Sequence, residues 1–263
     1  MGERLSNAKY VSFSGNKLTG PIPTSLCQEN NPMMNLDLSN NTLSGTIPAQ
    51  FGNCKSLLSL NLGVNRFMGV LPDTLWEAIN LGSLQLNDNQ FEGFFPDFIE
   101  GLKELEFLNL GSNKMEGKIL EVVGNLSKHH ILVLKSNYFN GSIPKTITQL
   151  KNLQFMDLSQ NQIVGSIPLQ LSGFPALLQK QIKGYLLGYI IELMYLSFEL
   201  EMVSKGSELL FSTVHSYNTK LDLSENHLEG EIPKEIGNLQ GLYMLNLKFI
   251  LLQGQKLHCK SYT

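Results

Sequence analysis

The sequence predicts an α/β solenoid with a concave parallel β-sheet, and three periodic features predict it. An asparagine recurs about every 24 residues, an alternating Leu-x-Leu precedes it, and a Gly-x-Ile-Pro string or a close variant follows it. The steps between successive asparagines are 25, 24, 24, 24, 24, 24 and 65 residues. A fixed period of this size indicates a solenoid, in which each repeat packs only on its neighbours. The asparagines are Asn16, Asn41, Asn65, Asn89, Asn113, Asn137, Asn161 and Asn226.

The alternating leucines predict a short strand with one buried face. Leu36 and Leu38 of the second repeat have counterparts in Leu60 and Leu62 of the third. Side chains alternate across a strand, so both leucines of each pair point into the core. Successive strands then stack as a parallel sheet, at roughly 4.8 Å per repeat.

The asparagine and the glycine predict how the chain leaves each strand. A carboxamide can bond the loop backbone of its own and neighbouring coils, and losing one such partner costs about 1–3 kcal/mol. Glycines such as Gly45 and Gly117 suit a turn with positive φ. The Ile-Pro pair favours an extended conformation in which proline donates no ladder bond, so we expect the chain to turn onto the outer face there.

These strings resemble the leucine-rich repeat family, and specifically the plant-type unit LxxLxxLxLxxNxLxGxIP of extracellular receptors. Examples are LDLSNNTLSGTIP, MDLSQNQIVGSIP and LDLSENHLEGEIP, and the resemblance covers residues 8–175 and 219–247. It implies a curved horseshoe or superhelix whose concave sheet binds peptides, microbial molecules or co-receptors.

A non-repeat segment interrupts the pattern, because the last step exceeds one repeat by 65 − 24 = 41 residues. We expect a helical stretch near 176–197 and then two strands around Lys205 and Gly206. The sequence divides into seven repeats without an N-terminal cap over 1–175, the insert over 176–218, two further repeats over 219–248, the last incomplete, and an unrelated tail over 249–263. Ile250 stands at the asparagine position of the last repeat and lacks an amide, so we expect this coil to fray.

The insert carries a second resemblance. KGSELLF and the following LDLSENHLEGEIPKEIG are similar to the island and the next repeat of plant receptor-like proteins, which lack a kinase domain. In that family, islands can shape the ligand or co-receptor surface. The alternative is an insert that only covers apolar surface with Tyr185, Tyr189 and Tyr195.

Composition and motifs favour a binding module over an enzyme. A net charge of −3 offers no basic surface for nucleic acid. The five histidines, of which only His129 and His130 are adjacent, and the three cysteines form no metal or catalytic signature. We therefore expect no catalytic residue, no metal site and no cofactor. The longest apolar run, 185–198, is shorter than a spanning helix and the N-terminus lacks a signal-like apolar run. We therefore expect no membrane segment in this chain, whereas the resemblance implies a parent receptor on the extracellular side of the plasma membrane.

Two cysteines and three glycosylation triplets are the candidate modification sites. Cys27 and Cys54 lie at similar positions of consecutive repeats, so they either form a bridge or remain two buried thiols. Asn40, Asn125 and Asn140 each begin an Asn-x-Ser/Thr triplet. Secretion of a parent receptor would favour glycosylation at all three, and unmodified surface asparagines are the alternative.

The residues that flank the strand leucines point to the concave side and form the predicted ligand surface. Repeats five to seven place an apolar strip there with a polar rim. Such a strip suits a peptide hot spot, although a few exposed apolar residues are ordinary. The strip is Phe107, Ile131, Val133 and Phe155, and the rim is Lys135, Asp157 and Gln160. Trp76 and Phe91 are assigned to the core.

The resulting function hypothesis is a recognition module of a plant cell-surface receptor-like protein in defence or development. It would bind a peptide, microbial or protein ligand on the concave face and dock a co-receptor kinase. The alternatives are part of a receptor kinase ectodomain, a secreted polygalacturonase-inhibitor-like protein, or a nonfunctional truncated product. Inhibitor-type solenoids normally run uninterrupted, so the island favours the receptor-like protein.

Overall fold

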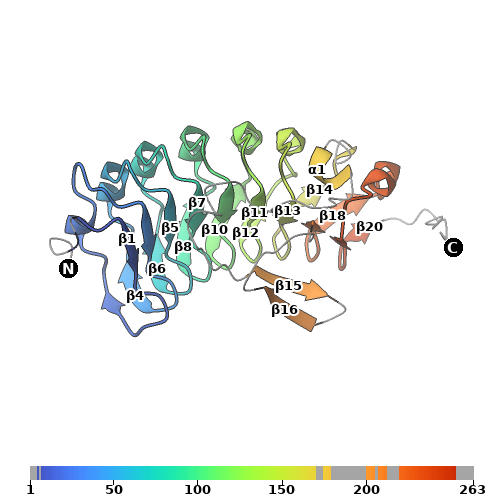
Figure 1. Ribbon diagram of the computed structural model, residues 1–263. Coiled ribbons are helices and arrows are strands. Elements are labelled where there is room, and N and C mark those ends of the chain that lie inside the picture. The colour runs from blue at the N-terminus through green and yellow to red at the C-terminus, as the bar shows by residue number, and fades with distance from the viewer. Residues whose placement is uncertain are drawn as a thin grey trace.

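The chain coils into a row of stacked turns that runs from the N-terminus to the C-terminus (Figure 1). The computed structural model describes residues 5, 7–169, 174–178, 200–204, 207–211 and 219–252. Each turn of the solenoid contributes one strand to a parallel sheet, as the leucine spacing predicts. In the described part of the chain, no helix is long and apolar enough to span a bilayer.

The main sheet has nine described strands in the order β1-β3-β5-β7-β9-β11-β13-β17-β19, and all its neighbours are parallel. The register is constant, so residues at equivalent repeat positions pair across the whole sheet. The strands are β1 (Tyr10–Ser12), β3 (Asn35–Asp37), β5 (Ser59–Asn61), β7 (Ser83–Gln85), β9 (Phe107–Asn109), β11 (Ile131–Val133), β13 (Phe155–Asp157), β17 (Lys220–Asp222) and β19 (Met244–Asn246).

A second set of parallel strands follows the ladder asparagines, and the sequence did not predict it. The backbone between the asparagine and the glycine pairs with the same stretch of the next coil before the Ile-Pro pair turns it away. β2 (Thr19–Gly20), β4 (Thr42–Gly45), β6 (Arg66–Gly69), β8 (Gln90–Phe94), β10 (Lys114–Lys118) and β12 (Tyr138–Asn140) form one sheet, and β14 (Val164–Gly165), β18 (His227–Gly230) and β20 (Leu251–Leu252) form another.

Short 3₁₀ helices close each coil on the side opposite the main sheet. Most begin directly after the proline of the Gly-x-Ile-Pro string, whose extended backbone supplies the helix start. They are η2 (Thr24–Leu26), η3 (Ala49–Asn53), η4 (Asp73–Glu77), η5 (Asp97–Gly101), η6 (Glu121–Asn125), η7 (Lys145–Gln149) and η9 (Lys234–Asn238). One short α-helix, α1 (Pro175–Leu178), lies between η7 and η9 in chain order, at the end of the seventh repeat.

The core lies between the main sheet and the 3₁₀ helices. Leu60 and Leu84 are fully buried, and the rings of Phe67 and Phe91 stack with centroids 6.2 Å apart. Phe91 is therefore core, as expected. Trp76 is not, because it is 49% exposed on η4, where its ring lies against the Gly101 backbone of the next coil.

The ladder asparagines bind the coils together. Asn113 Nδ2 donates to the carbonyl oxygens of Leu110 (3.0 Å) and Gly111 (3.1 Å) in its own coil. It also donates to Leu86 O (3.0 Å) of the preceding coil, and Asn113 Oδ1 accepts the N–H of Phe91 (3.0 Å) there. One buried carboxamide thus satisfies four backbone groups on two coils.

The residue before each ladder asparagine adopts a left-handed backbone. Ser112 has φ of 53° and Ser136 has φ of 53°, although neither is glycine. The turn-forming glycines have positive φ as predicted, for example Gly117 at 77°. At Gly117 a Cβ atom would also lie 2.6 Å from the ring of Phe94, so both backbone and space require glycine.

The solenoid continues without a break across the insert. Phe155 on β13 pairs with Lys220 on β17, as if the two repeats were consecutive. Asn226 Nδ2 donates to Leu158 O (2.9 Å) of the seventh repeat, and Asn226 Oδ1 accepts the N–H of Ile163 (3.0 Å). The eighth repeat therefore stacks directly on the seventh.

The insert contains the hairpin that the sequence predicts around Lys205 and Gly206. β15 (Leu200–Ser204) pairs antiparallel with β16 (Ser207–Phe211). Most of the expected helical stretch near 176–197, including Tyr185, Tyr189 and Tyr195, lies outside the described residues.

The last coil is more regular than predicted. β19 pairs with β17, and β20 pairs with β18 through Leu252, so the repeat geometry passes the expected boundary at residue 248. Ile250 is half-buried against the core instead of bonding the preceding coil. Apolar packing and the backbone ladders hold the coil in register at a position where the amide is missing.

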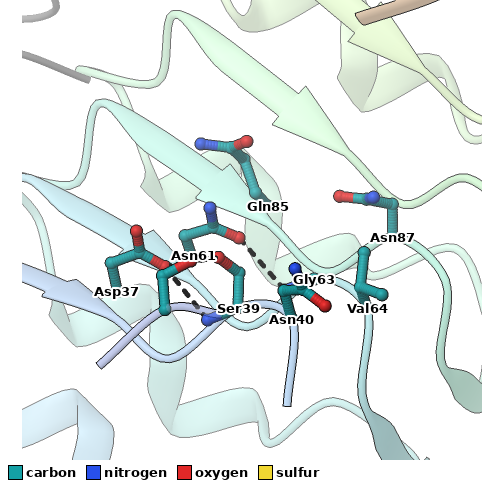
Figure 2. Close-up of a pocket in the computed structure, with 9 residues that line it drawn as sticks. Asp37, Ser39, Asn40, Asn61, Gly63, Val64, Gln85 and Asn87 are labelled. Atoms are coloured by element: carbon teal, nitrogen blue, oxygen red, sulfur yellow. Dashed lines mark hydrogen bonds between the residues drawn. The ribbon is translucent and has the colours of Figure 1, made fainter. Parts of the chain in front are cut away.

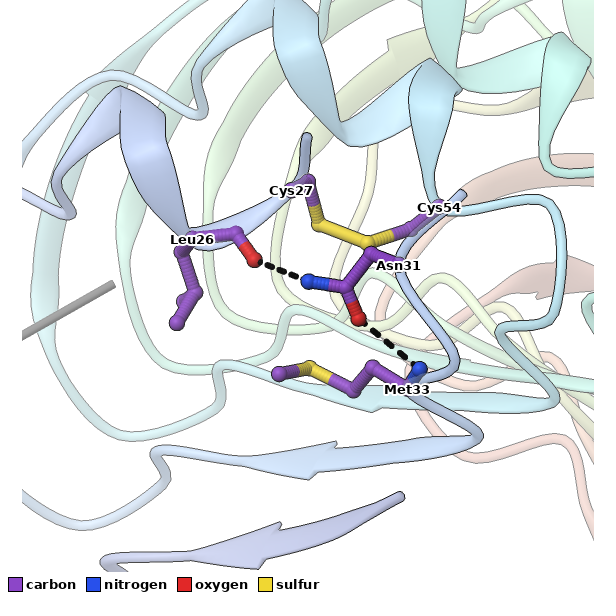
Figure 3. The surroundings of a disulfide bond; sticks show 5 residues. All are labelled: Leu26, Cys27, Asn31, Met33 and Cys54. Atoms are coloured by element: carbon purple, nitrogen blue, oxygen red, sulfur yellow. Dashed lines mark hydrogen bonds between the residues drawn. A yellow bond between two sulfur atoms is a disulfide. The ribbon is translucent and has the colours of Figure 1, made fainter. Parts of the chain in front are cut away.

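Cys27 and Cys54 form a disulfide between the first two coils (Figure 3), which decides between the two alternatives left open by the sequence. Beside it, Asn31 Nδ2 donates to Leu26 O (2.7 Å) and Asn31 Oδ1 accepts from Met33 N–H (2.8 Å). The bridge closes a separation of 27 residues, for which the loop-entropy model gives about 3–4 kcal/mol of stabilisation.

The ladder predicts unequal costs for two asparagine deletions. Asn113→Ala leaves buried backbone N–H and C=O groups on two coils without hydrogen-bond partners. It should therefore lower the free energy of unfolding by about 3 kcal/mol. Asn16 is exposed, and within the described part of the chain it bonds only its own turn, at Phe13 O (3.0 Å) and Ser14 O (3.1 Å). Asn16→Ala should therefore cost under about 1 kcal/mol. Urea denaturation, monitored by circular dichroism, measures the free energy of unfolding of both variants. Equal losses of stability would contradict the stabilising role of the asparagine contacts between coils.

Candidate functional site

The face of the main sheet that points away from the leucine core, here called the concave face, carries two rows of side chains. Constant register aligns each row along the solenoid. The first row is Tyr10, Asn35, Ser59, Ser83, Phe107, Ile131, Phe155, Lys220 and Met244, and the second row is Ser12, Asp37, Asn61, Gln85, Asn109, Val133, Asp157, Asp222 and Asn246.

The first four repeats form a polar hollow of about 260 Å³ on this face (Figure 2). Hydroxyl, amide and carboxylate groups dominate its wall. Asp37 Oδ1 accepts from Ser39 N–H (3.0 Å) and Ser39 Oγ (2.6 Å), and Asn61 Oδ1 accepts from Gly63 N–H (3.0 Å). These bonds to residues two positions later in the chain fix the orientations of the Asp37 and Asn61 side chains. The wall consists of Ser14, Asp37, Ser39, Asn40, Asn61, Gly63, Val64, Gln85 and Asn87.

The sequence did not single out this hollow. The signal was present in the second row, where Asp37, Asn61 and Gln85 offer adjacent hydrogen-bonding groups on three repeats. Polar residues on a strand face are ordinarily solvated surface, so pattern alone gave no reason to prefer them to an apolar strip.

The predicted apolar strip lies on the concave face, but it is not an exposed surface. Phe107 and Ile131 are 0% exposed, Val133 is 3% and Phe155 is 2%. None of the four belongs to the leucine core cluster. The prediction of an open hot spot is therefore wrong. A Phe107→Ala and Phe155→Ala double variant would remove buried packing, and its effect could not be assigned to ligand contacts alone.

The three residues of the predicted polar rim differ in their exposure. Lys135 is half-buried, and Gln160 is exposed. Gln160 Oε1 accepts a hydrogen bond from Ser136 Oγ, and Gln160 Nε2 donates to Glu225 Oε2 (3.3 Å). Asp157 is 2% exposed and belongs to a buried ion-pair network.

Lys220 is the centre of this network, a role that the repeat pattern does not indicate. Its Nζ lies 2.7 Å from Asp157 Oδ2 and 3.3 Å from Asp222 Oδ2. The ammonium also lies 5.1 Å from the centre of the Phe155 ring. Asn246 Nδ2 donates to Asp222 Oδ2 (3.0 Å) and completes the shell. Because these charges are paired and hydrogen-bonded, they can remain buried.

The three glycosylation triplets lie on exposed asparagines of different surfaces. Asn40 lines the polar hollow, Asn125 ends η6 and Asn140 ends β12. Asn125 Nδ2 donates to Glu100 Oε1 (2.9 Å), a contact that a glycan would have to replace. Their modification remains a prediction.

His129 occupies a leucine position of the core. Its Nδ1 donates to Leu105 O (3.0 Å), and its Nε2 is buried without a hydrogen-bond partner. Burial lowers the pKa of His129 to about 4, against an ordinary value of 6.5. Burial also lowers the pKa of the adjacent His130. These histidines are structural, and among the described residues no group of three or more His, Cys, Asp or Glu is arranged to hold a metal ion.

The Leucine Rich Repeat family model matches residues 7–28, 33–54, 152–174 and 219–239. The matched segments fall on the coils at both ends of the stack and include β1, β3, β13 and β17. The LRR receptor-like serine/threonine-protein kinase GSO2 of Arabidopsis thaliana is 41% identical over 54 residues, which are 20% of this chain and 4% of that protein. Two plant receptor structures share the coil geometry over nearly the whole chain.

The first is the Arabidopsis receptor kinase HAESA, in complex with the peptide hormone IDA and the co-receptor SERK1. It superposes with a TM-score of 0.73 at 32% identity, over 93% of this chain and 34% of that one. This chain is a leucine-rich repeat solenoid, and its coils are similar to those of this plant receptor. The plant peptide hormone receptor RGFR1, in complex with RGF2, superposes on the solenoid with a TM-score of 0.70 at 28% identity, over 93% of this chain and 36% of that one. The solenoid thus spans about a third of the length of these ectodomains.

The buried His129 predicts that stability falls in mild acid. The unfolded chain takes up a proton near pH 6.5 and the folded chain only near pH 4. The folded state is therefore fully favoured above pH 6.5 and loses about 3 kcal/mol as the pH falls to 4. His129→Leu restores the repeat pattern and should remove this part of the pH dependence, leaving the part due to His130. Urea denaturation from pH 7 to 4 measures it, and equal slopes for wild type and variant would contradict the assignment.

Proposed function

We propose that this chain is a non-catalytic recognition module of a plant cell-surface receptor-like protein. It binds a peptide or protein ligand on the concave face, on the extracellular side of the plasma membrane, and the bound state docks a co-receptor kinase in defence or developmental signalling. The observation that carries the proposal is the polar hollow of the first four repeats, set on a solenoid that superposes on two peptide-hormone receptors.

The hollow suits an extended peptide for a chemical reason. A peptide backbone presents alternating N–H and C=O groups that need partners when they leave water. Gln85, Asn87 and Asn61 carry carboxamides that both donate and accept, and they come from two neighbouring repeats. The hollow therefore offers paired donors and acceptors in line along the solenoid, and the closed apolar cluster of repeats five to eight does not.

Part of a receptor kinase ectodomain is the second candidate. The GSO2 and HAESA matches favour it, because both of those proteins are receptor kinases. The two candidates share the ligand face and differ in what transmits the signal. In either case, the ligand and partner of HAESA are properties of that protein, and only the class of ligand is carried over here.

Peptide selection tests the proposal. A phage-displayed library of random dodecapeptides is panned against the full chain, and the enriched peptides are measured by fluorescence anisotropy. Gln85→Ala with Asn87→Ala removes two carboxamides from the hollow and should weaken these peptides about tenfold or more, the equivalent of about 1.4 kcal/mol. Gln90→Ala with Glu92→Ala is the matched control, since both residues are exposed on β8 of the same repeat.

The control variant should bind the selected peptides as tightly as the wild type does. Failure to enrich any peptide would count against a peptide-binding concave face. An equal loss in the hollow variant and the β8 variant would show that binding is not at the hollow.

A further inference from the structure

Three repeats contain the string Asp-Leu-Ser, preceded by Leu36, Met156 or Leu221, and its aspartates Asp37, Asp157 and Asp222 stand in the second row of the concave face. In each of them, Oδ1 of the aspartate accepts bonds from the N–H and Oγ of the serine two residues later. This contact fixes the carboxylate and turns the second oxygen, Oδ2, to the concave side. The three aspartates therefore have the same local conformation, with Oδ1 bonded to the serine and Oδ2 available to a partner.

At repeats seven and eight, the chain itself shows what this group binds. The Oδ2 atoms of Asp157 and Asp222 both receive the ammonium of Lys220. Lys220 occupies the first row, one repeat after Phe155 and directly beside the two carboxylates. At this place, an amine from a first-row side chain is thus the partner of the Asp-Leu-Ser carboxylates.

The equivalent place at repeats two and three lacks the amine. The register Asn35–Ser59 and Asp37–Asn61 matches Phe155–Lys220 and Asp157–Asp222. Ser59 therefore stands where Lys220 stands, and its side chain is too short to reach the carboxylate. Among the described residues, no hydrogen bond or ion pair engages Oδ2 of Asp37, which lines the open hollow.

Two further acceptors beside Asp37 also lack donors. Ser59 is 0% exposed, and its Oγ has no hydrogen-bond partner. Asn35 Oδ1, two residues before Asp37 on β3 and paired in register with Ser59, is buried and unpartnered as well. Buried polar atoms are ordinarily satisfied, so a cluster of unsatisfied acceptors beside a fixed carboxylate marks a place for a donor.

We propose that Asp37, with Asn35 and Ser59 beside it, binds a basic side chain of the ligand, a lysine ammonium or an arginine guanidinium. The inference deepens the proposed function, on which it rests, by naming one chemical feature of the peptide. Asn61 Oδ1 is held by Gly63 N–H, so Asn61 Nδ2 is left to donate to a carbonyl oxygen of the same peptide. A lone carboxylate favours an organic cation over a metal ion, which needs several anionic or carbonyl ligands.

The probe is the pentapeptide Ac-Gly-Gly-Lys-Gly-Gly-NH₂, titrated into the full chain and followed by amide chemical shifts in NMR spectra. The wild-type chain should show saturable shifts around residues 35–39 and 59–63. The same peptide with an acetylated lysine, which is neutral, should give none. Asp37→Asn keeps the size of the side chain and should weaken binding about tenfold, as expected for a charge-assisted contact.

A second variant fills the site from within. Ser59→Lys places an internal amine beside Asp37, as Lys220 does beside Asp157, and should abolish binding of the lysine probe. If this variant does not fold, Asp37→Asn still decides the question. Glu92→Gln removes an exposed carboxylate of β8 and should leave the titration unchanged.

Absence of saturable binding to the wild type, or equal binding to wild type and Asp37→Asn, would overturn the inference. Shifts spread over all acidic surfaces, and reduced equally by Glu92→Gln, would also overturn it. Such a result leaves the peptide-binding proposal standing if library peptides still depend on Gln85 and Asn87. If neither the lysine probe depends on Asp37 nor the library peptides depend on Gln85 and Asn87, the hollow is not a ligand site.

Discussion

The structure depends on one side-chain contact, the asparagine carboxamide that bonds two successive coils. The strands of the main sheet are only three residues long, too short to hold a register by themselves. The carboxamide adds bonds at the strand exit, where the left-handed residue before it turns the backbone inwards. Each coil thus repeats the geometry of the previous one, and two aligned rows of side chains result on the concave face.

The same contact explains how the chain accommodates a long insert. Asn226 reaches back to the seventh repeat with the bonds that a consecutive coil makes, and Lys220 adds an ion pair to Asp157. From the described start of the insert, Leu177 packs in the core and its carbonyl oxygen accepts the N–H of Gly241 (2.9 Å) in the repeat that follows. The concave face has different characters on its two halves, with polar groups around an open hollow in the first four repeats and a closed apolar and ionic cluster from the fifth to the eighth.

Sequence alone predicted the features that the repeat period determines. The nine-strand ladder, the core leucines and the positive φ of glycines such as Gly117 follow from residue types that recur at fixed positions. The second sheet was missed because the residues of β6 and β8 carry no alternating apolar pattern of their own. These strands form because the stacked coils place equivalent backbone segments side by side. Ile250 was expected to break its coil, but the adjoining ladders compensate for the missing amide.

The candidate site was harder to predict than the fold. Periodicity correctly assigned Phe107 and Phe155 to the concave face, but it could not tell whether they are exposed, because burial depends on what lies over a face. Lys220 looked like an ordinary surface lysine, and only the register shows it between two carboxylates. The same comparison distinguishes Asp37, which shares the Asp-Leu-Ser string and the serine contact of Asp157 but has Ser59 in place of a lysine on the next strand.

Hydrogen exchange at the Ile163 amide tests directly whether an asparagine contact joins the repeats on the two sides of the insert. This amide donates to Asn226 Oδ1, which lies 63 residues later, beyond the insert. We expect Asn226→Ala to speed exchange of the Ile163 amide, while the Phe91 amide, which bonds Asn113, stays protected. Unchanged protection of Ile163 would contradict the claim that asparagine contacts between coils join the repeats on both sides of the insert.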